Sequence, residues 1–280
     1  MQVDVKLDRV TVSGKVHDRI SLLELARQLG WTVKTSQDRV YAVLERLFDN
    51  NDSEIVAILA PNPYQQDSWR VDTSNHLNSD ELRRVSSISN RLIGAHLTRV
   101  DVAFDFINGF YKPMKHIITR SKATQTAIFE TEYRDASHCL QTLYSGRRSS
   151  DKMYRLYNKL AEQKRHGVVV SNEIERWERW EIQLRGKKTS DWVESAKEML
   201  SQIKYPLYQD LKPADIAVLH AIDDGLISFK DFSKAKATRL RKLRSLGVGY
   251  NDDYSRLAEQ KLVESIDQIN DEVSQFLDRL

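Results

Sequence analysis

Two aspartates stand on the polar side of a predicted strand. In LTRVDVAFDF, residues 97–106, the even positions are apolar, whereas the odd positions include Arg99, Asp101 and Asp105. Successive side chains of a strand point to opposite faces, so the two carboxylates share one face. Aspartate is depleted inside strands, and two aspartates on one face therefore suggest a chemical role.

Two further stretches alternate in the same way. RWEIQLR, residues 179–185, puts four polar side chains on one face: Arg179, Glu181, Gln183 and Arg185. KMYRLYNK, residues 152–159, sets Tyr154 and Leu156 against Arg155, Tyr157 and Lys159. If these strands pair in one sheet, its polar face gathers acids, an amide, cations and a phenol. An antiparallel sheet with one face in water shows the same alternation without any chemistry, and this alternative stays open.

The oxygen-bearing side chains of this face suit a divalent cation. Carboxylate and amide oxygens are hard ligands for Mg²⁺ or Mn²⁺, and such ions commonly serve phosphate chemistry. The predicted ligands are Asp101, Glu181, Gln183 and Asp105. Asp101 and Asp105 are about 13 Å apart along an extended strand, which is too far for both to bind one ion. We expect Asp101, opposite Glu181, to be the ligand, with Asp105 as the alternative.

Tyr157 is the predicted nucleophile of this face. A phenol with a pKa of about 10 needs a nearby metal or cation, such as Lys159, to ionise near neutral pH. Attack on a phosphodiester would form a phosphotyrosine ester, which keeps enough free energy for the strand to be rejoined. The chain has 11 tyrosines, so a purely structural role for Tyr157 is the open alternative, and Tyr154 is close by.

Composition is that of a soluble globular protein. Hydrophobic residues make up 40% of the 280 residues and charged residues 30%, with a mean hydropathy of -0.55 and no long apolar run. We therefore expect no membrane span and no signal peptide. The single cysteine, Cys139, favours a reducing cytoplasm. A net charge of +3 permits nucleic-acid binding without proving it.

Hydrophobic periodicity predicts a mixed α+β protein. Strands are expected at 8–14, twice within 54–75, and at 97–106, 124–130, 139–146, 152–158 and 179–185. Helices are expected at 20–31, at 36–48 and at 79–94, the last with Ser79 as its cap. Beyond residue 190 the patterns are helical. The predicted fold is a largely antiparallel central sheet with helices on one face, followed by a smaller helical C-terminal region.

This pattern divides the chain into a catalytic domain, 1–195, and a helical region, 205–280. Within the second part, the segment 232–247 collects six cations: Lys234, Lys236, Arg239, Arg241, Lys242 and Arg244. They could bind DNA phosphates or simply form a solvated helix face. The last helix spaces its apolar residues like a coiled-coil seam, although packing on its own domain explains the spacing equally simply.

The strand 97–106, then YSGRRSSDKMYRLYNKLAEQ, then RWEIQLR resemble the replication initiation (Rep_trans) family in order and spacing. This family comprises rolling-circle plasmid and filamentous-phage initiators and related mobile-element relaxases, which are HUH-like endonucleases. The resemblance is firm over residues 97–187. It implies that Tyr157 is the nicking tyrosine, with Arg155 and Lys159 beside it, and that the acidic strands bind metal. The chain departs from the pattern at Gln183, where plasmid members from staphylococci carry glutamate.

The resemblance also implies a reaction and partners. A family member recognises a replication origin, cuts one strand, remains on the 5′ phosphate and later rejoins the strand. A host helicase is the implied partner, members often act as dimers, and the implied location is the cytoplasm of a prokaryotic host. The predicted DNA contacts are Arg179, Arg185, Arg147, Arg148, Lys152, Arg239, Arg241, Lys242 and Arg244.

Two other classes of function stay open. LLELARQLGW followed by SQDRVYAVLERL resembles a helix-turn-helix, which would make the chain a sequence-specific DNA-binding regulator without catalysis. A dimer formed through the last helix would instead make it an interaction protein. A covalent protein–DNA adduct separates the nicking enzyme from both.

Overall fold

The computed structural model describes residues 1–36, 39–48, 52–65, 67–74, 77–109, 117–118, 130–136, 140–147, 149–208, 211–246 and 250–277. The chain forms two compact units. The first unit comprises Met1–Val5, Ala103–Ile182 and Val193–Glu264, and the second comprises Lys6–Val102, Gln183–Trp192 and Ser265–Leu280. These units do not follow the expected boundary near residues 195–205, and the separate roles assigned to 1–195 and 205–280 stay a prediction.

The sheet of the second unit is built from antiparallel neighbours. Its strands are β1 (Gln2–Lys15), β2 (Thr32–Ser36), β3 (Arg39–Leu47), β4 (Ser53–Pro61) and β5 (Ser68–Thr73), in the order β2-β3-β4-β5-β1. The pairs β2–β3, β3–β4, β4–β5 and β1–β5 are antiparallel. The strands predicted at 8–14 and within 54–75 are confirmed.

The helix predicted at 36–48 is wrong, because this segment forms β3. Ala42, Val43 and Leu44 are all buried, and the strand register shifts between Leu44 and Glu45. Three consecutive buried residues and a bulge break the two-residue alternation, so the apolar spacing resembled that of a helix. The helix-turn-helix interpretation depended on this second helix and is wrong as well.

The helices α1 (Arg19–Gln28) and α2 (Ser79–Ser89) belong to the second unit. Helix α1 begins at Asp18, whose carboxylate accepts the Ile20 amide at 2.9 Å. Helix α2 is capped by Asn78 rather than by Ser79. Asn78 accepts the Glu81 amide at 2.9 Å, and the Glu81 carboxylate accepts the Asn78 amide at 2.8 Å. This reciprocal capping box satisfies amides that would otherwise lack partners.

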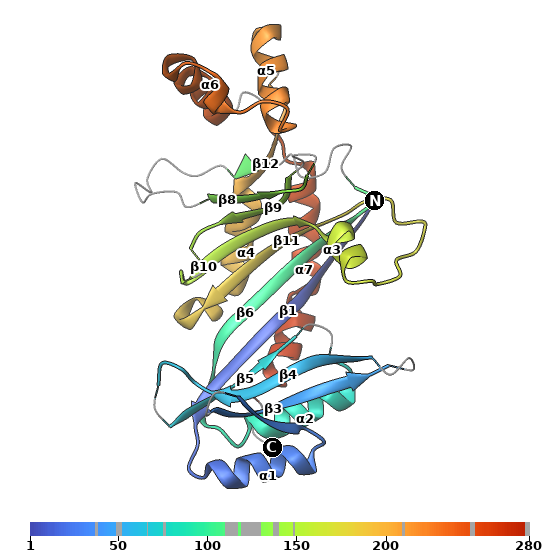
Figure 1. Cartoon of the computed structure of the whole chain (residues 1–280), viewed down its shortest axis with the longest axis vertical. Helices are drawn as coiled ribbons and strands as arrows, with labels where there is room; N and C mark the ends of the chain where they lie inside the picture. The colour runs from blue at the N-terminus through green and yellow to red at the C-terminus, as the bar shows by residue number, and fades with distance from the viewer. Residues whose placement is uncertain are drawn as a thin grey trace. The chain divides into compact units, whose positions relative to one another are not determined.

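The sheet of the first unit carries the predicted tyrosine. Its strands are β6 (Ile93–Ile107), β11 (Trp177–Arg185), β10 (Lys152–Asn158), β9 (Leu140–Ser145) and β8 (Glu130–Arg134), in this order (Figure 1). The pairs β10–β9 and β8–β9 are antiparallel. Strands β6 and β11 have residues in both units. The strands predicted at 97–106, 139–146, 152–158 and 179–185 are confirmed, whereas most of 124–130 lies outside the described residues.

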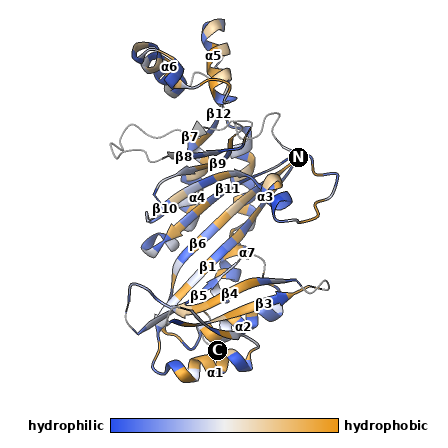
Figure 2. Ribbon diagram, in the orientation of Figure 1, coloured by the Kyte–Doolittle hydropathy of each residue, from blue (hydrophilic) through white to orange (hydrophobic). Residues whose placement is uncertain are grey.

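Strand alternation is visible in the hydropathy of the long strands. Figure 2 shows hydrophobic and hydrophilic residues following one another along β1 and β6. On β6, however, Asp101 and Asp105 are as buried as their apolar neighbours Val102 and Phe104, with each of the four at most 1% exposed. The polar side of this strand is therefore not a solvated face, and its carboxylates need partners.

The remaining elements of the chain are mainly helical. They are α3 (Lys159–Arg165), α4 (Trp192–Gln202), α5 (Pro213–Asp223), α6 (Lys234–Leu246) and α7 (Asp253–Ser274), with 3₁₀ turns η1 (Gly186–Thr189) and η2 (Phe229–Asp231). Three short strands, β7 (Ile117–Ile118), β12 (Ile203–Pro206) and β13 (Tyr250–Asn251), form a separate sheet. The expectation that strands end near residue 190 is thus wrong for β12 and β13, which are too short to show a period.

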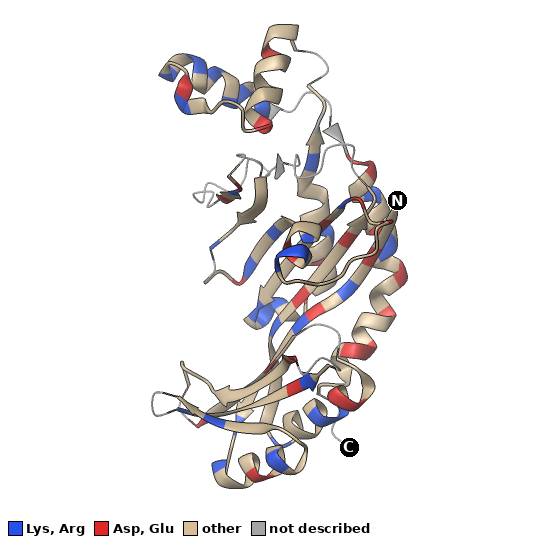
Figure 3. Cartoon of the chain, turned by 45° about the vertical axis from the view of Figure 1, so that its right-hand side comes forward, with Lys and Arg blue, Asp and Glu red and all other residues tan. Residues whose placement is uncertain are grey.

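The helical region closes around a small core of its own. Tyr208, Leu219, Ile222 and Leu240 are buried together between α5 and α6. Helix α6 confirms the basic helix predicted at 232–247, and Figure 3 shows its Lys and Arg residues. In α7 and the turn after it, Leu262, Ile269 and Phe276 are buried within the chain. Leu262 belongs to the first unit and the other two residues to the second, so packing on a separate 205–280 domain stays a prediction.

The predicted fold class is confirmed: the protein is mixed α+β, with a large antiparallel sheet and a helical C-terminal region. Among the described residues, no helix has both the length and the apolar character needed to cross a membrane.

Candidate active site

Tyr157 and Arg155 lie on the same side of β10. The Arg155 Nη2 donates to the Tyr157 hydroxyl at 3.2 Å, and the guanidinium carbon is 4.4 Å from the centre of the phenol ring. This contact confirms the predicted alternation, in which residues 155 and 157 share a face. Tyr157 is only 5% exposed, as is Tyr154, so burial does not distinguish the two tyrosines. The distance to the nearby cation does distinguish them. The Arg155 guanidinium carbon is 4.4 Å from the Tyr157 ring centre, whereas the Lys152 ammonium is 6.0 Å from the Tyr154 ring centre.

Arg155 connects the phenol to a carboxylate of the next strand. Its Nη2 also donates to the Glu181 carboxylate of β11, and Glu181 is 4% exposed. Burial alone would lower the pKa of Arg155, but the negative charges of Glu181 and Tyr157 raise that pKa well above its ordinary value. The guanidinium therefore stays charged next to the phenol and favours its ionised form.

Lys159 follows the strand directly and is the first residue of α3. Asn158 caps this helix by accepting the Ala161 amide at 3.0 Å. The Lys159 ammonium is 5.7 Å from the Tyr157 ring centre and 2.5 Å from the Glu162 carboxylate. Burial would raise the pKa of Glu162, but the bond and charge of Lys159 lower it below the ordinary value. Lys159 is thus a buried, paired cation near the phenol.

Asp105 and Arg179 form a second buried pair in the first unit. The Arg179 Nε and Nη2 donate to the two Asp105 oxygens at 2.6 and 2.8 Å, and the Trp177 Nε1 donates to one of them at 2.8 Å. Both members of the pair are 1% exposed. Arg179 therefore does not lie on the surface where DNA was predicted to contact it, because its charge neutralises a buried carboxylate.

Asp101 and Gln183 belong to the second unit. The Arg99 Nε donates to Asp101 at 2.8 Å and its Nη2 donates at 2.5 Å. Burial raises the pKa of Asp101 above its ordinary value, although the bond and charge of Arg99 lower it. Gln183 is buried, and its Nε2 has no hydrogen-bond partner among the described residues. That Asp101 and Glu181 serve one cation stays a prediction of the sequence.

Carboxylate and amide oxygens are suitable ligands for Mg²⁺ or Mn²⁺. However, each of the three carboxylates, Asp101, Asp105 and Glu181, is already paired with an arginine. Glu181 has a carboxylate, and Gln183, two positions along the same strand, has a buried amide whose oxygen is the atom that could bind such an ion. No group of three His, Cys, Asp or Glu side chains suited to a metal occurs within the described ranges. Asp105 in particular would have to give up both bonds with Arg179 to bind a cation.

The other predicted DNA contacts differ in their surroundings. Arg147, Arg239, Arg241 and Lys242 are exposed, while Arg185 and Lys152 are half-buried. Lys152 pairs with Glu198 at 2.5 Å, and Arg239 pairs with Asp215. Arg244 contacts Asp223 at 2.9 Å inside the α5–α6 core, where Asp223 also accepts the Tyr208 hydroxyl at 2.6 Å. Arg148 lies outside the described residues.

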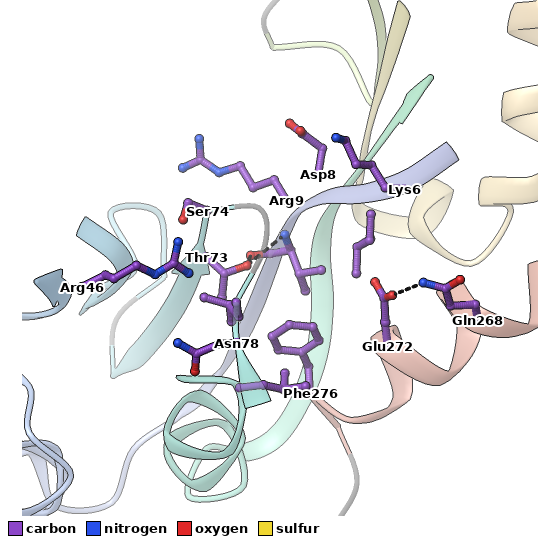
Figure 4. Close-up of a pocket in the computed structure, with 14 residues that line it drawn as sticks. Lys6, Asp8, Arg9, Arg46, Thr73, Ser74, Asn78, Gln268, Glu272 and Phe276 are labelled. Atoms are coloured by element: carbon purple, nitrogen blue, oxygen red, sulfur yellow. Dashed lines mark hydrogen bonds between the residues drawn. The ribbon is translucent and has the colours of Figure 1, made fainter. Parts of the chain in front are cut away.

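A pocket of about 510 Å³ lies in the second unit (Figure 4). Figure 4 shows cations and acids together at its rim, including Lys6, Asp8 and Arg9, while Phe276 lies below them. Arg46, which also lines it, is held by Glu81 through bonds of 2.8 and 2.6 Å. The lining mixes both signs of charge and therefore does not define one class of ligand.

Two partners of the site, Glu162 and Trp177, were not among the residues predicted from the sequence. Glu162 stands three residues after Lys159, the spacing at which helical side chains pair, so it could have been found. Trp177 precedes the quoted strand by two residues and shares its polar face, but its bond to Asp105 depends on how β6 and β11 face each other.

Comparison with known proteins supports the resemblance over this region. Residues 95–213 match the family model of the replication initiation factors, Rep_trans. The solved structure of a rolling circle replication initiator protein from Geobacillus stearothermophilus is similar with a TM-score of 0.46 and 16% identity, covering 76% of this chain and 90% of that chain. No curated protein sequence is significantly similar to the chain. The family match includes β10, β11, Lys159 and all of β6 except its first two residues, so every predicted catalytic and metal-binding residue lies within it.

Proposed function

We propose that the protein is a rolling-circle replication initiator that cuts and rejoins one DNA strand through Tyr157. The match of residues 95–213 to the replication initiation factors supports the general role. The observation that carries the chemistry is the contact of one guanidinium, Arg155, with both the Tyr157 hydroxyl and the Glu181 carboxylate. A purely structural strand tyrosine does not need a charged donor at its hydroxyl.

In the proposed reaction Tyr157 exchanges one phosphate ester for another. The phenol loses its proton to solvent, and its oxygen forms a bond to phosphorus while the bond from phosphorus to the 3′ oxygen breaks. The 3′ oxygen takes up a proton, which leaves a free 3′ hydroxyl and a 5′-phosphotyrosine. The reverse attack by a 3′ hydroxyl rejoins the strand. Because one ester replaces another, no external energy source is needed.

Arg155 and Lys159 have separate roles in this proposal. Arg155 lies against the phenol and stabilises its anion, and its charge also suits the extra negative charge of the phosphoryl transition state. Lys159 is held near the ring by Glu162, so it adds positive potential without needing to move. Glu181 orients Arg155 and is the first candidate to hold Mg²⁺ or Mn²⁺, with Gln183 beside it on β11. A cation there would polarise the scissile phosphate.

The proposed partners are origin DNA and a host helicase. In this view residues 1–195 carry the cutting chemistry, and residues 205–280 bind DNA, dimerise, or do both. The exposed cations of α6, among them Arg241 and Lys242, are available for phosphate contacts. Asp223 pairs with Arg244, so Arg244 holds the core of this region in addition to any such contact.

A denaturing gel tests the cutting reaction. The full chain is incubated with single-stranded oligonucleotides tiled across its gene and flanking DNA, with Mg²⁺ or Mn²⁺ and with EDTA. A covalent adduct is expected with at least one oligonucleotide. Tyr157→Phe should abolish the adduct, whereas the matched variant Tyr154→Phe should keep it. An adduct that survives in Tyr157→Phe would assign the nucleophile elsewhere, and binding without any adduct would favour a non-catalytic regulator.

A further inference from the structure

Two arginines of the second unit are held by aspartates in the same manner. Arg9 donates through Nε and Nη2 to Asp72 at 2.8 and 2.5 Å, and Arg99 donates through the same two nitrogens to Asp101 at 2.8 and 2.5 Å. Each guanidinium thus keeps Nη1 outside these bonds. A guanidinium offers five N–H donors, so both side chains are fixed in place with donors left for another acceptor.

These two pairs differ from the Arg179–Asp105 pair of the first unit in how far the arginine is exposed to solvent. The side chain of Arg9 is 39% exposed and that of Arg99 is 21% exposed, whereas that of Arg179 is 2% exposed against Asp105. The buried pair serves folding, since no outside group can reach it. The other two pairs present partly exposed, positioned cations to solvent.

Two more arginines join this surface. Arg70 stands on β5 two residues before Asp72, opposite Ser13 of β1, and its charge acts on Asp72. Its buried Nε has no hydrogen-bond partner among the described residues. Arg185, at the end of β11, is close enough to Arg99 and Arg9 that their charges oppose its own.

We call Arg9, Arg70, Arg99 and Arg185 the arginine face. Carboxylates that act on these arginines include those of Asp72, Asp101 and Asp8. Burial lowers the pKa of Arg185 first, and the charges of Arg99 and Arg9 lower it further, against Asp101 and Tyr64. Cations crowded in this way favour a polyanion, which relieves their repulsion.

An exposed aromatic residue lies beside these cations. Tyr64 is 94% exposed in the turn between β4 and β5, where its amide donates to the Asn62 side chain at 3.0 Å. Its phenol acts electrostatically on Arg185, and its turn leads into β5, the strand of Arg70 and Asp72. A single exposed tyrosine is ordinary on a protein surface. Next to a group of positioned arginines, it forms the combination that binds single strands, in which cations hold phosphates and an aromatic ring stacks on a base.

We propose that the arginine face and Tyr64 bind single-stranded DNA, with the guanidinium groups on the phosphates and the phenol ring against an unpaired base. A duplex hides the faces of its bases, so the stacking contact selects the single strand. This inference rests on the proposed function for the source of the strand, which is the one that is cut and displaced. It assigns the contact to residues of the second unit, whereas Tyr157 belongs to the first unit.

Fluorescence anisotropy with a labelled 20-nucleotide oligothymidylate measures this binding. The full chain carries Tyr157→Phe so that no strand is cut. Tyr64→Ala is expected to weaken binding about 5- to 100-fold, which corresponds to the loss of one stacked base. Phe48→Ala is the matched control, since Phe48 is a 46% exposed aromatic residue of the same unit outside this surface, and it should bind like the parent.

The cations are tested through the salt dependence of the same binding. Arg70→Gln and Arg185→Gln should each reduce the slope of log affinity against log salt by about 0.7 to 1, the effect of one lost phosphate contact. Lys188→Gln removes the same charge from an ion pair with Asp191 and should leave the slope unchanged. Parent-like binding by Tyr64→Ala, Arg70→Gln and Arg185→Gln would overturn the proposal. An equal loss for a duplex of the same length would also overturn the assignment to single strands.

The adduct assay distinguishes a failure of the proposed binding surface from a failure of the proposed nicking reaction. If the chain forms no adduct but the Tyr64 and arginine variants lose affinity for single strands, the nicking proposal fails and the binding surface stands. If the adduct forms and these variants bind normally, the binding surface fails and the nicking proposal stands. Thermal melting of each variant checks that a loss of affinity does not come from unfolding.

Discussion

The Arg155 guanidinium contacts both the hydroxyl group and the aromatic ring of Tyr157. Its Nη2 is 3.2 Å from the hydroxyl oxygen, and its central carbon is 4.4 Å from the ring centre. The two residues are separated by one position on β10, so strand alternation alone puts them side by side. Glu181 then holds the guanidinium from the neighbouring strand. The arrangement supplies a fixed positive charge at the atom that would attack DNA.

Removing this charge should affect the reaction more than it affects binding. Arg155→Gln is expected to slow adduct formation about 100-fold, the usual effect of losing one donor to a developing anion. Arg155→Lys should recover part of the rate, because it keeps a cation but not the planar fork. Single-turnover gels at saturating oligonucleotide measure the rate. An Arg155→Gln protein that reacts at the parent rate would remove Arg155 from the reaction.

The same substitution leaves Glu181 buried without its partner, so stability needs its own control. Arg155→Gln should lower the free energy of unfolding by about 3–5 kcal/mol. The double variant Arg155→Gln/Glu181→Gln should recover much of this loss while the adduct stays slow. Urea denaturation followed by tryptophan fluorescence gives the stabilities. Recovery of both properties together would mean that the pair serves folding alone.

Asp105 and Arg179 should behave as a structural pair. Asp105→Asn is expected to cost about 3–5 kcal/mol of stability, since it leaves the buried Arg179 charge without a counter-charge. Asp105→Asn/Arg179→Met should be less destabilised than Asp105→Asn, because no unpaired charge remains. At a temperature where Asp105→Asn is folded, adduct formation by this variant should depend on metal concentration in the same way as in the parent. A shifted metal requirement would instead make Asp105 a ligand.

The pair of Arg9 and Asp72 predicts a pH dependence of stability. Burial opposes ionisation of Asp72, but the bond and charge of Arg9 and the bond from Thr11 lower its pKa below the ordinary value. A carboxyl group with a lower pKa in the folded state adds stability above its unfolded pKa, about 3.9, and loses it as the pH falls through the folded value. Asp72→Asn should therefore cost about 1–3 kcal/mol at pH 7 and progressively less below pH of about 4.

Urea denaturation between pH 3 and pH 7 checks this sign. The difference between parent and Asp72→Asn should shrink steadily toward the acid end. Asp191→Asn serves as the control, because the Asp191 side chain is 57% exposed and its ion pair with Lys188 is loose at 3.7 Å. A constant difference across the whole range would show that Asp72 does not contribute through its charge.

The cations of helix α6 should divide into those that contribute to DNA binding and those that contribute to stability. Lys236 and Arg241 are exposed, with their charges over the rings of Phe232 and Phe229 at 4.6 and 4.8 Å. Lys236→Gln and Arg241→Gln should leave the melting temperature near that of the parent and reduce the salt dependence of duplex binding. Arg244→Gln should instead lower the melting temperature, because it leaves Asp223 with one partner fewer. Unchanged salt dependence in both exposed variants would assign α6 to a solvated face.

Local sequence determined the strands that alternate strictly and the helix that is strongly basic. KMYRLYN predicted β10 to the residue, and its two-residue period put Arg155 beside Tyr157. The family resemblance of the three motifs is also a property of sequence, since it depends on residue types and their order. Alternation failed at 39–47, where a bulge and burial on both faces removed the two-residue period.

Tertiary structure alone decided which charges meet. Alternation puts Asp101, Asp105 and Glu181 on polar faces, but only the packing of strands showed that each carboxylate is paired with an arginine: Arg99, Arg179 and Arg155. The Arg99 pair lies within one strand, whereas the other two join different strands, and their strength depends on burial, which residue spacing does not encode. The arginine face likewise combines residues from four strands that are far apart in the chain, and it exists only once those strands lie together.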